Sequence, residues 1–273
     1  DYIIWDALDH ASIIEGIRLS PAKSLRYKHN DMEALERRLK QCEPDRIKLV
    51  VVDGVFSMEG DLCNLPEICR LAEQYKASVM VDEAHGFGVM GDHGRGVCNY
   101  FGLTDKVDLI MGTFSKSFAA IGGFIAGSKT TINYIRHHAR SYIFSASCTP
   151  AATAAAHKSL EIMLREPERV LALQEKTTYC LDRFRKLGFE IGNTATPIVP
   201  LFIRDNEKTF RVTAMLFEEG VFVNPVVAPA VAPEDTLIRF SLMATHTYEQ
   251  LDEAISKIHK VFQALDIPLE PRP

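Results

Sequence analysis

Residues 78–86, with the sequence SVMVDEAHG, join a short apolar run to a polar one. The apolar positions predict a buried strand over 78–82, and a helix is expected just before it over 66–75. The run IKLVVVD at 47–53 predicts a second strand that is buried on both faces. Strands that alternate with helices in this way indicate βαβ units and a parallel sheet.

The same alternation extends outward in both directions from this centre. The elements predicted in the first part are strands at 2–5, 107–113 and 122–126 and helices at 129–140 and 151–164, the last with Thr149 as N-cap and Pro150 at its first turn. The elements predicted after a break at 165–167 are helices at 168–187, 209–219 and 248–265 and strands at 199–203 and 237–242. We therefore predict a large domain over 1–165 with a mostly parallel sheet and a smaller C-terminal α/β domain over 166–273. Because Asp1 opens directly into a strand, an N-terminal portion of the large domain is expected to precede it.

The composition is that of an ordinary globular protein. The chain has 273 residues, 47% of them hydrophobic and 25% charged, and a net charge of −5 that does not favour nucleic-acid binding. The six cysteines form no C-x-x-C pair, which favours reduced thiols over a disulfide framework or a metal site. No apolar run approaches the roughly 20 residues of a membrane span. A cytoplasmic location is expected, and peripheral contact with a membrane stays open.

Asp82 is the first candidate for a functional residue. It ends a buried strand, and ligands in open α/β sheets bind outside the carboxyl ends of the strands. A buried carboxylate costs several kcal/mol unless it is paired, so a cationic partner is implied. The alternative is that Asp82 only caps the following turn.

Lys116 is the second candidate. It lies in the sequence TFSKS at 113–117, after another predicted strand, with hydroxyl groups beside it that can hold a phosphate. A partly buried lysine can act as a nucleophile, although a lone lysine of this kind is more often a surface residue. Together with Asp82 and with His85 three residues later, it matches the needs of pyridoxal 5'-phosphate (PLP). That cofactor requires a carboxylate to keep its ring nitrogen protonated and a lysine to carry its aldehyde.

Three segments, read in order, resemble the α-oxoamine synthases: VDGVFSMEGD at 52–61, VDEAHG at 81–86 and GTFSKS at 112–117. This family comprises serine palmitoyltransferase, 8-amino-7-oxononanoate synthase, 2-amino-3-ketobutyrate CoA ligase (glycine C-acetyltransferase) and 5-aminolevulinate synthase. The resemblance runs the full length of the chain. It implies the aspartate aminotransferase-like fold, fold type I of the PLP-dependent transferases, with further residues ahead of the position that matches Asp1.

The resemblance also implies roles for individual residues. Lys116 would be the Schiff-base lysine and the acid/base at Cα, Asp82 would pair with the pyridinium nitrogen, and His85 would hydrogen-bond the ring 3-oxygen. His10 would stack on the ring, although by itself it would be taken for a residue that starts a helix. Further cofactor contacts are implied for Ser57, Thr113, Ser115, Ser145 and Ser147.

Two further implications concern the substrate and the assembly. Arg239 matches the arginine that receives the carboxylate of the amino acid, for which a guanidinium fork is suited, and otherwise would be a solvated strand residue. The segment 144–147 matches one that reaches the phosphate bound by a neighbouring subunit, which implies a homodimer. Which hydroxyl group makes that contact stays open.

The segments at 142–147, 224–233 and 240–247 are most similar to the bacterial serine palmitoyltransferase branch. That branch implies a decarboxylative Claisen condensation of L-serine with palmitoyl-CoA to 3-ketosphinganine, the first step of sphingolipid synthesis. The ligase and the oxononanoate synthase share parts of these segments and remain alternatives. A non-catalytic partner subunit is disfavoured by the presence of Lys116, Asp82 and His85. A nucleotide-binding module would need a G-x-G-x-x-G or G-x-x-x-x-G-K-S/T turn after a strand, and neither turn is expected here.

Overall fold

The computed structural model describes residues 1–269. They form two compact units, one made of residues 1–56 and 62–167 and the other of residues 57–61 together with the chain from 168 onward. The segment 57–61 belongs to the second unit although it lies far from it in the sequence. Two buried threonines of that unit, Thr194 and Thr196, donate hydrogen bonds from their hydroxyls to Gly60 O at 3.0 and 2.8 Å.

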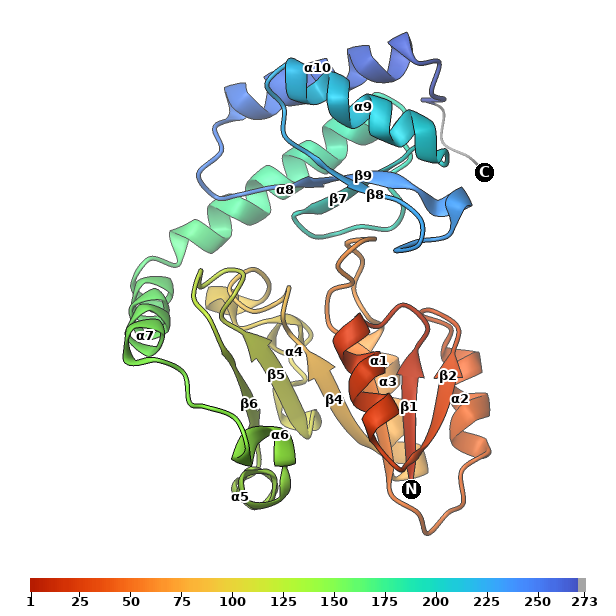
Figure 1. Ribbon diagram of the computed structural model, residues 1–273, viewed down its shortest axis with the longest axis vertical. Coiled ribbons are helices and arrows are strands. Elements are labelled where there is room, and N and C mark those ends of the chain that lie inside the picture. Colours follow the sequence, from red (N-terminus) through yellow and green to blue (C-terminus); the bar gives the residue numbers. More distant parts are fainter. Residues whose placement is uncertain (270–273) are drawn as a thin grey trace. The chain divides into compact units, whose positions relative to one another are not determined.

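The first unit is built on a six-stranded sheet with the order β2-β1-β3-β4-β5-β6 (Figure 1). Its strands are β1 (Tyr2–Asp6), β2 (Lys23–Tyr27), β3 (Lys48–Asp53), β4 (Ser78–Asp82), β5 (Leu109–Thr113) and β6 (Gly123–Gly127). The first five pair in parallel and β6 runs antiparallel to β5, so the predicted mostly parallel sheet is confirmed. In β3, Val50, Val51 and Val52 are buried on both faces of the sheet, as its continuous hydrophobic run predicts. In β4, Val79 and Val81 are buried on one face, while Met80 on the other is half-buried.

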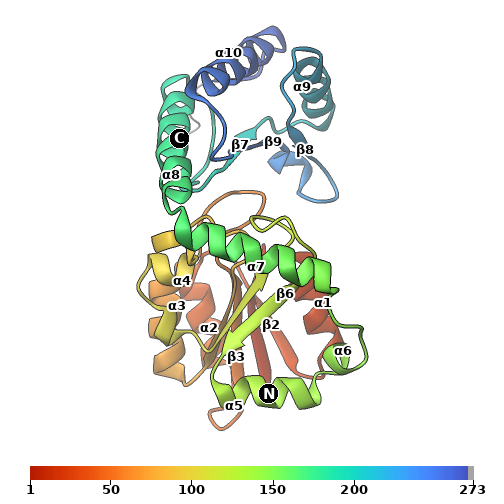
Figure 2. The ribbon, with the colours of Figure 1, turned by 90° about the vertical axis from the view of Figure 1, so that its left-hand side faces the viewer.

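Helices lie on both sides of this sheet, with α2 and α3 on one side and α1 on the other (Figure 2). The helices of the unit are α1 (Ala11–Leu19), α2 (Met32–Lys40), α3 (Leu65–Tyr75), α4 (Val97–Tyr100), α5 (Lys129–His138), α6 (Arg140–Ile143) and α7 (Pro150–Arg165). The predicted helix over 129–140 ends at His138, because Ala139 leaves the helical backbone with ψ of 104° before α6 begins. The predicted N-cap of α7 is confirmed, since the Thr149 hydroxyl accepts a hydrogen bond from Ala152 N.

The second unit contains a three-stranded antiparallel sheet with the order β7-β9-β8. Its elements are α8 (Glu168–Lys186), β7 (Ile198–Phe202), α9 (Asn206–Glu218), β8 (Asn224–Val226), β9 (Leu237–Ser241) and α10 (Tyr248–Ala264). Helix α9 starts three residues before its predicted start because Asp205 caps it. Helix α10 has the predicted capping box of Thr247 and Gln250, and its apolar stripe is buried.

Among residues 1–269, no helix combines the length and the apolar character that crossing a membrane requires.

Candidate active site

Polar residues gather where the parallel strands of the first unit end. Asp6, Asp53 and Asp82 are the last residues of β1, β3 and β4, and Thr113 is the last residue of β5. Because parallel strands point the same way, their carboxyl ends meet at one edge of the sheet. Asp53 and Asp82 are also register partners, so their side chains leave adjacent strands on the same face.

Asp82 is buried, with 4% of its surface exposed, and its Oδ1 accepts a hydrogen bond from Ala84 N at 2.8 Å. Burial raises the pKa of this carboxyl, while the positive charges of Lys116 and His10 lower it. The cationic partners that the sequence requires are therefore present. The bond from Ala84 also shows that Asp82 caps its own turn, so the two interpretations of this residue are compatible.

Glu83 fixes the loop that carries His85, a role that the sequence did not indicate. Its buried carboxylate accepts hydrogen bonds from Val97 N at 2.8 Å and Cys98 N at 2.7 Å. A side chain at Gly96 would collide with it, since a Cβ there would lie 2.6 Å from the carboxylate. The segment between Glu83 and α4 is thus anchored at both ends, and the half-buried His85 lies near its start.

The expectation that the chain has no G-x-G-x-x-G turn is wrong, because residues 86–91 of this loop, GFGVMG, have that spacing. In the structure they lead into a single 3₁₀ turn at Asp92–Gly94 and then into α4, which has only four residues. A phosphate-binding turn needs the N-terminus of a longer helix directly behind it. The nucleotide-binding alternative therefore lacks its structural context.

Lys116 lies exposed in the loop that connects β5 to β6. The loop is closed by hydrogen bonds from Phe114 N to Gly122 O at 2.9 Å and from Ala120 N to Phe114 O at 2.7 Å. Two aromatic rings of the loop pack with two others in an apolar cluster whose paired centroids lie 4.8 to 5.9 Å apart. The rings belong to Phe87, Phe114, Phe118 and Phe124.

The Lys116 loop and the His85 loop are joined directly. The Ser117 hydroxyl donates a hydrogen bond to Phe87 O at 2.8 Å. Gly88 makes this approach possible, because it has a φ of +79° and a Cβ there would lie 2.4 Å from the Ser117 hydroxyl oxygen. The two loops that carry the lysine and the histidine thus share one contact.

The hydroxyl groups near Lys116 bond to one another. Thr113 Oγ1 lies 2.9 Å from Ser115 Oγ and donates to Gly122 O at 3.2 Å. Ser145 and Ser147 are exposed in the segment between α6 and α7, where Ser145 Oγ donates to Ser141 O at 2.5 Å. Contacts of these hydroxyls with a phosphate stay predictions.

His10 is the N-cap of α1, with its ring Nδ1 accepting a hydrogen bond from Ser12 N at 3.2 Å. It is exposed, and its backbone N donates to Asp53 Oδ2 at 2.7 Å. The interpretation of His10 as a residue that starts a helix is therefore confirmed. In this place the charge of its ring still acts on Asp82, whose pKa it lowers.

Two further carboxyls complete the strand-end cluster, and both are almost completely buried. Burial, with the charge of Asp53 next in importance, raises the pKa of Asp9 to about 9. Burial, followed by the charge of Asp82, raises the pKa of Asp53 to about 7. Both groups therefore hold protons well above the pH at which an exposed aspartate loses its own.

We expect the stability of the apoprotein to fall as the pH rises from 6 to 8. A carboxyl whose pKa is raised on folding releases its proton on unfolding, so the free energy of unfolding declines between the ordinary value of 3.8 and the folded pKa. For Asp53 the decline ends near pH 7 and for Asp9 near pH 9. Urea denaturation should show a loss of about 4 kcal/mol over this interval, and Asp53→Asn should reduce it by about a third. Equal stability at the two pH values would contradict the expectation.

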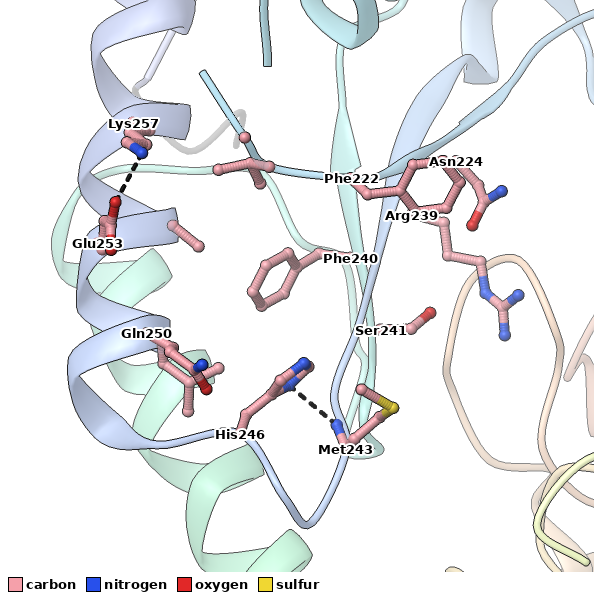
Figure 3. A pocket seen from close by; sticks show the side chains of 14 residues that line it. Phe222, Asn224, Arg239, Phe240, Ser241, Met243, His246, Gln250, Glu253 and Lys257 are labelled. Atoms are coloured by element: carbon pink, nitrogen blue, oxygen red, sulfur yellow. Dashed lines mark hydrogen bonds and ion pairs between the residues drawn. The ribbon is translucent and has the colours of Figure 1, made fainter. Parts of the chain in front are cut away.

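In the second unit, Arg239 lies on β9 and is half-buried. Burial lowers the pKa of its guanidinium, and its buried Nε has no hydrogen-bond partner among residues 1–269. Figure 3 shows Arg239 beside Asn224, its register partner on β8, with Phe240 directed to the other side of the strand. These residues line a cavity of about 550 Å³ that β9 shares with α10. A half-buried cation with an unused donor is suited to an anionic ligand.

Comparison with known proteins assigns the family. The family model for aminotransferases of class I and II matches residues 1–258. The chain belongs to this family. Serine palmitoyltransferase of Bacteroides thetaiotaomicron is 64% identical over 267 residues, which cover 98% of this chain and 68% of the relative. The 8-amino-7-oxononanoate synthase of Thermosipho melanesiensis is 46% identical, with the same shares covered.

Among solved structures, serine palmitoyltransferase from S. paucimobilis with a bound PLP–myriocin aldimine has a TM-score of 0.94 at 32% identity, covering 98% of this chain and 68% of that one. The predicted α-oxoamine synthase relationship, the aspartate aminotransferase-like fold and the cofactor PLP are thereby confirmed.

The residues of this member of the class I and II aminotransferase family fit PLP. The cofactor needs a carboxylate near its ring nitrogen and an accessible amine near its aldehyde. Asp82 supplies a buried carboxylate on which the charge of an exposed amine, that of Lys116, acts. The sequence pointed to this pair but not to Asp9, Asp53 or Glu83. Each of these three also lies at the end of a strand or in the turn that follows one. That position in the sequence could have identified them.

Proposed function

We propose that this chain catalyses the PLP-dependent condensation of L-serine with a long-chain acyl-CoA, palmitoyl-CoA above others, to give 3-ketosphinganine, CoA and CO2. The observation that carries the proposal is the buried carboxylate of Asp82 at the carboxyl edge of the sheet, whose pKa the charge of Lys116 lowers. The 64% identity to a serine palmitoyltransferase over nearly the whole chain supports the choice of substrates.

When bound, PLP supplies an electron sink for the negative charge that develops at the Cα atom of the amino acid. Asp82 would hold the proton on the ring nitrogen, and the charges of Lys116 and His10, which lower its pKa, favour the ionised carboxylate that this role needs. Lys116 would hold the cofactor through its aldehyde and, once released, move the proton at Cα. His85 would donate a hydrogen bond to the ring 3-oxygen, and the exposed ring of His10 would stack on the cofactor.

Several hydroxyl groups are proposed to hold the cofactor in place. Thr113 and Ser115, linked at 2.9 Å beside Lys116, would contact its phosphate, and Ser57 would contribute from the segment 57–61. Ser145 and Ser147 would reach the phosphate of a neighbouring subunit, which makes the protein a homodimer. Five buried thiols and one exposed thiol, none of them paired, fit a reducing compartment such as the cytoplasm.

Arg239 is proposed to bind the carboxylate of serine. We expect Arg239→Ala to raise KM for serine by roughly 10- to 100-fold, because a charge-assisted hydrogen bond to a half-buried guanidinium is lost. Steady-state kinetics at saturating acyl-CoA measure this change. Arg211→Ala, at an exposed arginine of the same unit, is the control and should leave KM unchanged. An Arg239→Ala enzyme with normal KM would remove this residue from the proposal.

The proposed reaction is tested by a product assay. The PLP-loaded protein is offered serine, glycine or alanine, each with palmitoyl-, acetyl- or pimeloyl-thioester, and the product is identified by mass. Formation of 3-ketosphinganine supports the proposal. A product only from alanine and the pimeloyl thioester would assign the chain to the oxononanoate synthases, to which it is 46% identical in one relative. A product only from glycine and acetyl-CoA would assign it to the ligases.

A further inference from the structure

Asp53 is a buried carboxyl at the centre of the strand-end cluster, to which neither the sequence nor the proposed reaction gives a role. Only 6% of its surface is exposed. It neighbours Asp82 across the β3–β4 pair, and the charge of Lys116 lowers its pKa as it does that of Asp82. Asp53 and Asp82 therefore share one cation at the same edge of the sheet.

Within residues 1–269, the Asp53 side chain accepts one hydrogen bond, from the backbone N of His10 at 2.7 Å. A bond this short to a buried carboxyl has the geometry of a charge-assisted hydrogen bond. The ring of His10 is in turn held by its bond with Ser12 at the start of α1. The position of the His10 ring therefore depends on a backbone atom that Asp53 holds.

The neighbouring residue Asp9 makes the complementary link. Its carboxyl accepts hydrogen bonds from Asp53 N and from Asp6 N, both at 2.9 Å. The turn between β1 and α1 is thus bonded twice to the end of β3. The side chain of Asp9 accepts one hydrogen bond from β3, and the backbone of His10 donates the other. Two links in opposite directions restrict this turn to one arrangement.

We propose that Asp53 is a positioning residue of the PLP site: it holds the backbone of His10 beside Asp82, and its charge shifts the electrostatic balance between Asp82 and Lys116. Asp53 touches neither substrate nor cofactor in this proposal and acts through its neighbours. The inference rests on the proposed function only for the identity of the cofactor that His10, Asp82 and Lys116 surround.

The charge of Asp53 changes in the neutral range, because burial and the charge of Asp82 raise its pKa to about 7. The titratable groups that face it come from several elements, and any of them can respond to its charge. They are Asp6, Asp9 and His10 from the end of β1 and the following turn, Cys63 before α3, Asp82 at the end of β4 and Lys116 after β5. An ionised Asp53 favours the charged ammonium form of Lys116 and so disfavours the free amine that PLP captures.

The test is the dissociation constant of PLP for the apoprotein, measured by fluorescence titration at pH 6 and pH 8.5. Asp53→Asn keeps an oxygen that can accept the bond from His10 but has no charge. We expect it to bind PLP within about twofold of the wild type at pH 6 and about fivefold more tightly at pH 8.5, where the wild-type carboxyl is ionised. Asp53→Ala loses both features and should raise the dissociation constant about tenfold at pH 6.

Asp108→Asn is the matched control. The Asp108 carboxyl also accepts a strand backbone bond, from Val79 N at 2.8 Å, but it lies at the start of β5, away from the carboxyl edge. The affinity of Asp108→Asn for PLP should change with pH as that of the wild type does. The proposal is overturned if the affinity of Asp53→Asn for PLP falls with rising pH as that of the wild type does. It is also overturned if Asp53→Ala binds PLP with the affinity of the wild type.

If Asp53→Ala fails to fold, Asp53→Asn, which has the same size, still decides the question. The proposed substrates can be refuted separately from the role of Asp53. If the variants bind PLP as expected but the product assay gives a different condensation product, the proposed substrates are wrong and the role of Asp53 stands.

Discussion

Lys116→Ala is expected to lower turnover by at least about 10⁴-fold, because the same amine holds the cofactor and moves the proton at Cα. Reduction with borohydride, followed by digestion and mass spectrometry, should find the cofactor attached to the peptide that contains Lys116 in the wild type and to no peptide in the variant. The yellow colour of the wild type should bleach in the same treatment. This variant also removes the positive charge that lowers the pKa of Asp82, so that carboxyl should become a weaker acid.

Lys129→Ala is the control for this experiment. Lys129 is an exposed lysine at the start of α5 in the same unit, and its removal should change neither turnover nor labelling. A Lys116→Ala protein that turns over normally, or a label on another lysine, would refute the assignment.

The second large effect is expected at Asp82. Asp82→Asn replaces the carboxylate by a neutral amide of the same size, so the ring nitrogen of PLP loses the partner that keeps it protonated and the electron sink weakens. We expect turnover to fall by roughly 10²- to 10⁴-fold with a smaller effect on stability, because the amide oxygen can still accept the bond from Ala84. Stopped-flow absorbance and turnover rates measure the effect.

Asp108→Asn again serves as the comparison, since its carboxyl bonds to a strand backbone without a site nearby. Near-normal turnover by Asp82→Asn would show that another group protonates the ring. Asp53, the adjacent carboxyl, would then be the first candidate to examine.

Much of the architecture follows from local signals that a sequence contains in full. The strand 78–82 was predicted with its observed bounds because apolar residues fill it and a carboxylate ends it. Helix α10 was predicted because its apolar stripe and its capping box lie within a few turns of each other. Asp82 and Lys116 could be paired in advance for the same reason: each follows a strand, and parallel strands end at one edge.

Other elements could not be predicted because their signals are weak or not local. Strand β2, KSLRY, mixes charged and apolar residues at the edge of the sheet and has no strand pattern of its own. Strand β8 has three residues, one of them a proline. The antiparallel direction of β6 depends on how its chain returns to β5 and not on its composition.

The sequence by itself determined the βα alternation, the family motifs and the residues Lys116, Asp82 and His85 as candidates for PLP chemistry. Only the tertiary structure decided which carboxyls surround them. Asp9 and Asp53 lie 44 residues apart in sequence, and they meet because β1 inserts beside β3 in the sheet. Strand order results from the packing of whole elements, and no local pattern encodes it. The same packing excludes water from these carboxyls, and this burial, more than their identity as aspartates, raises their pKa values.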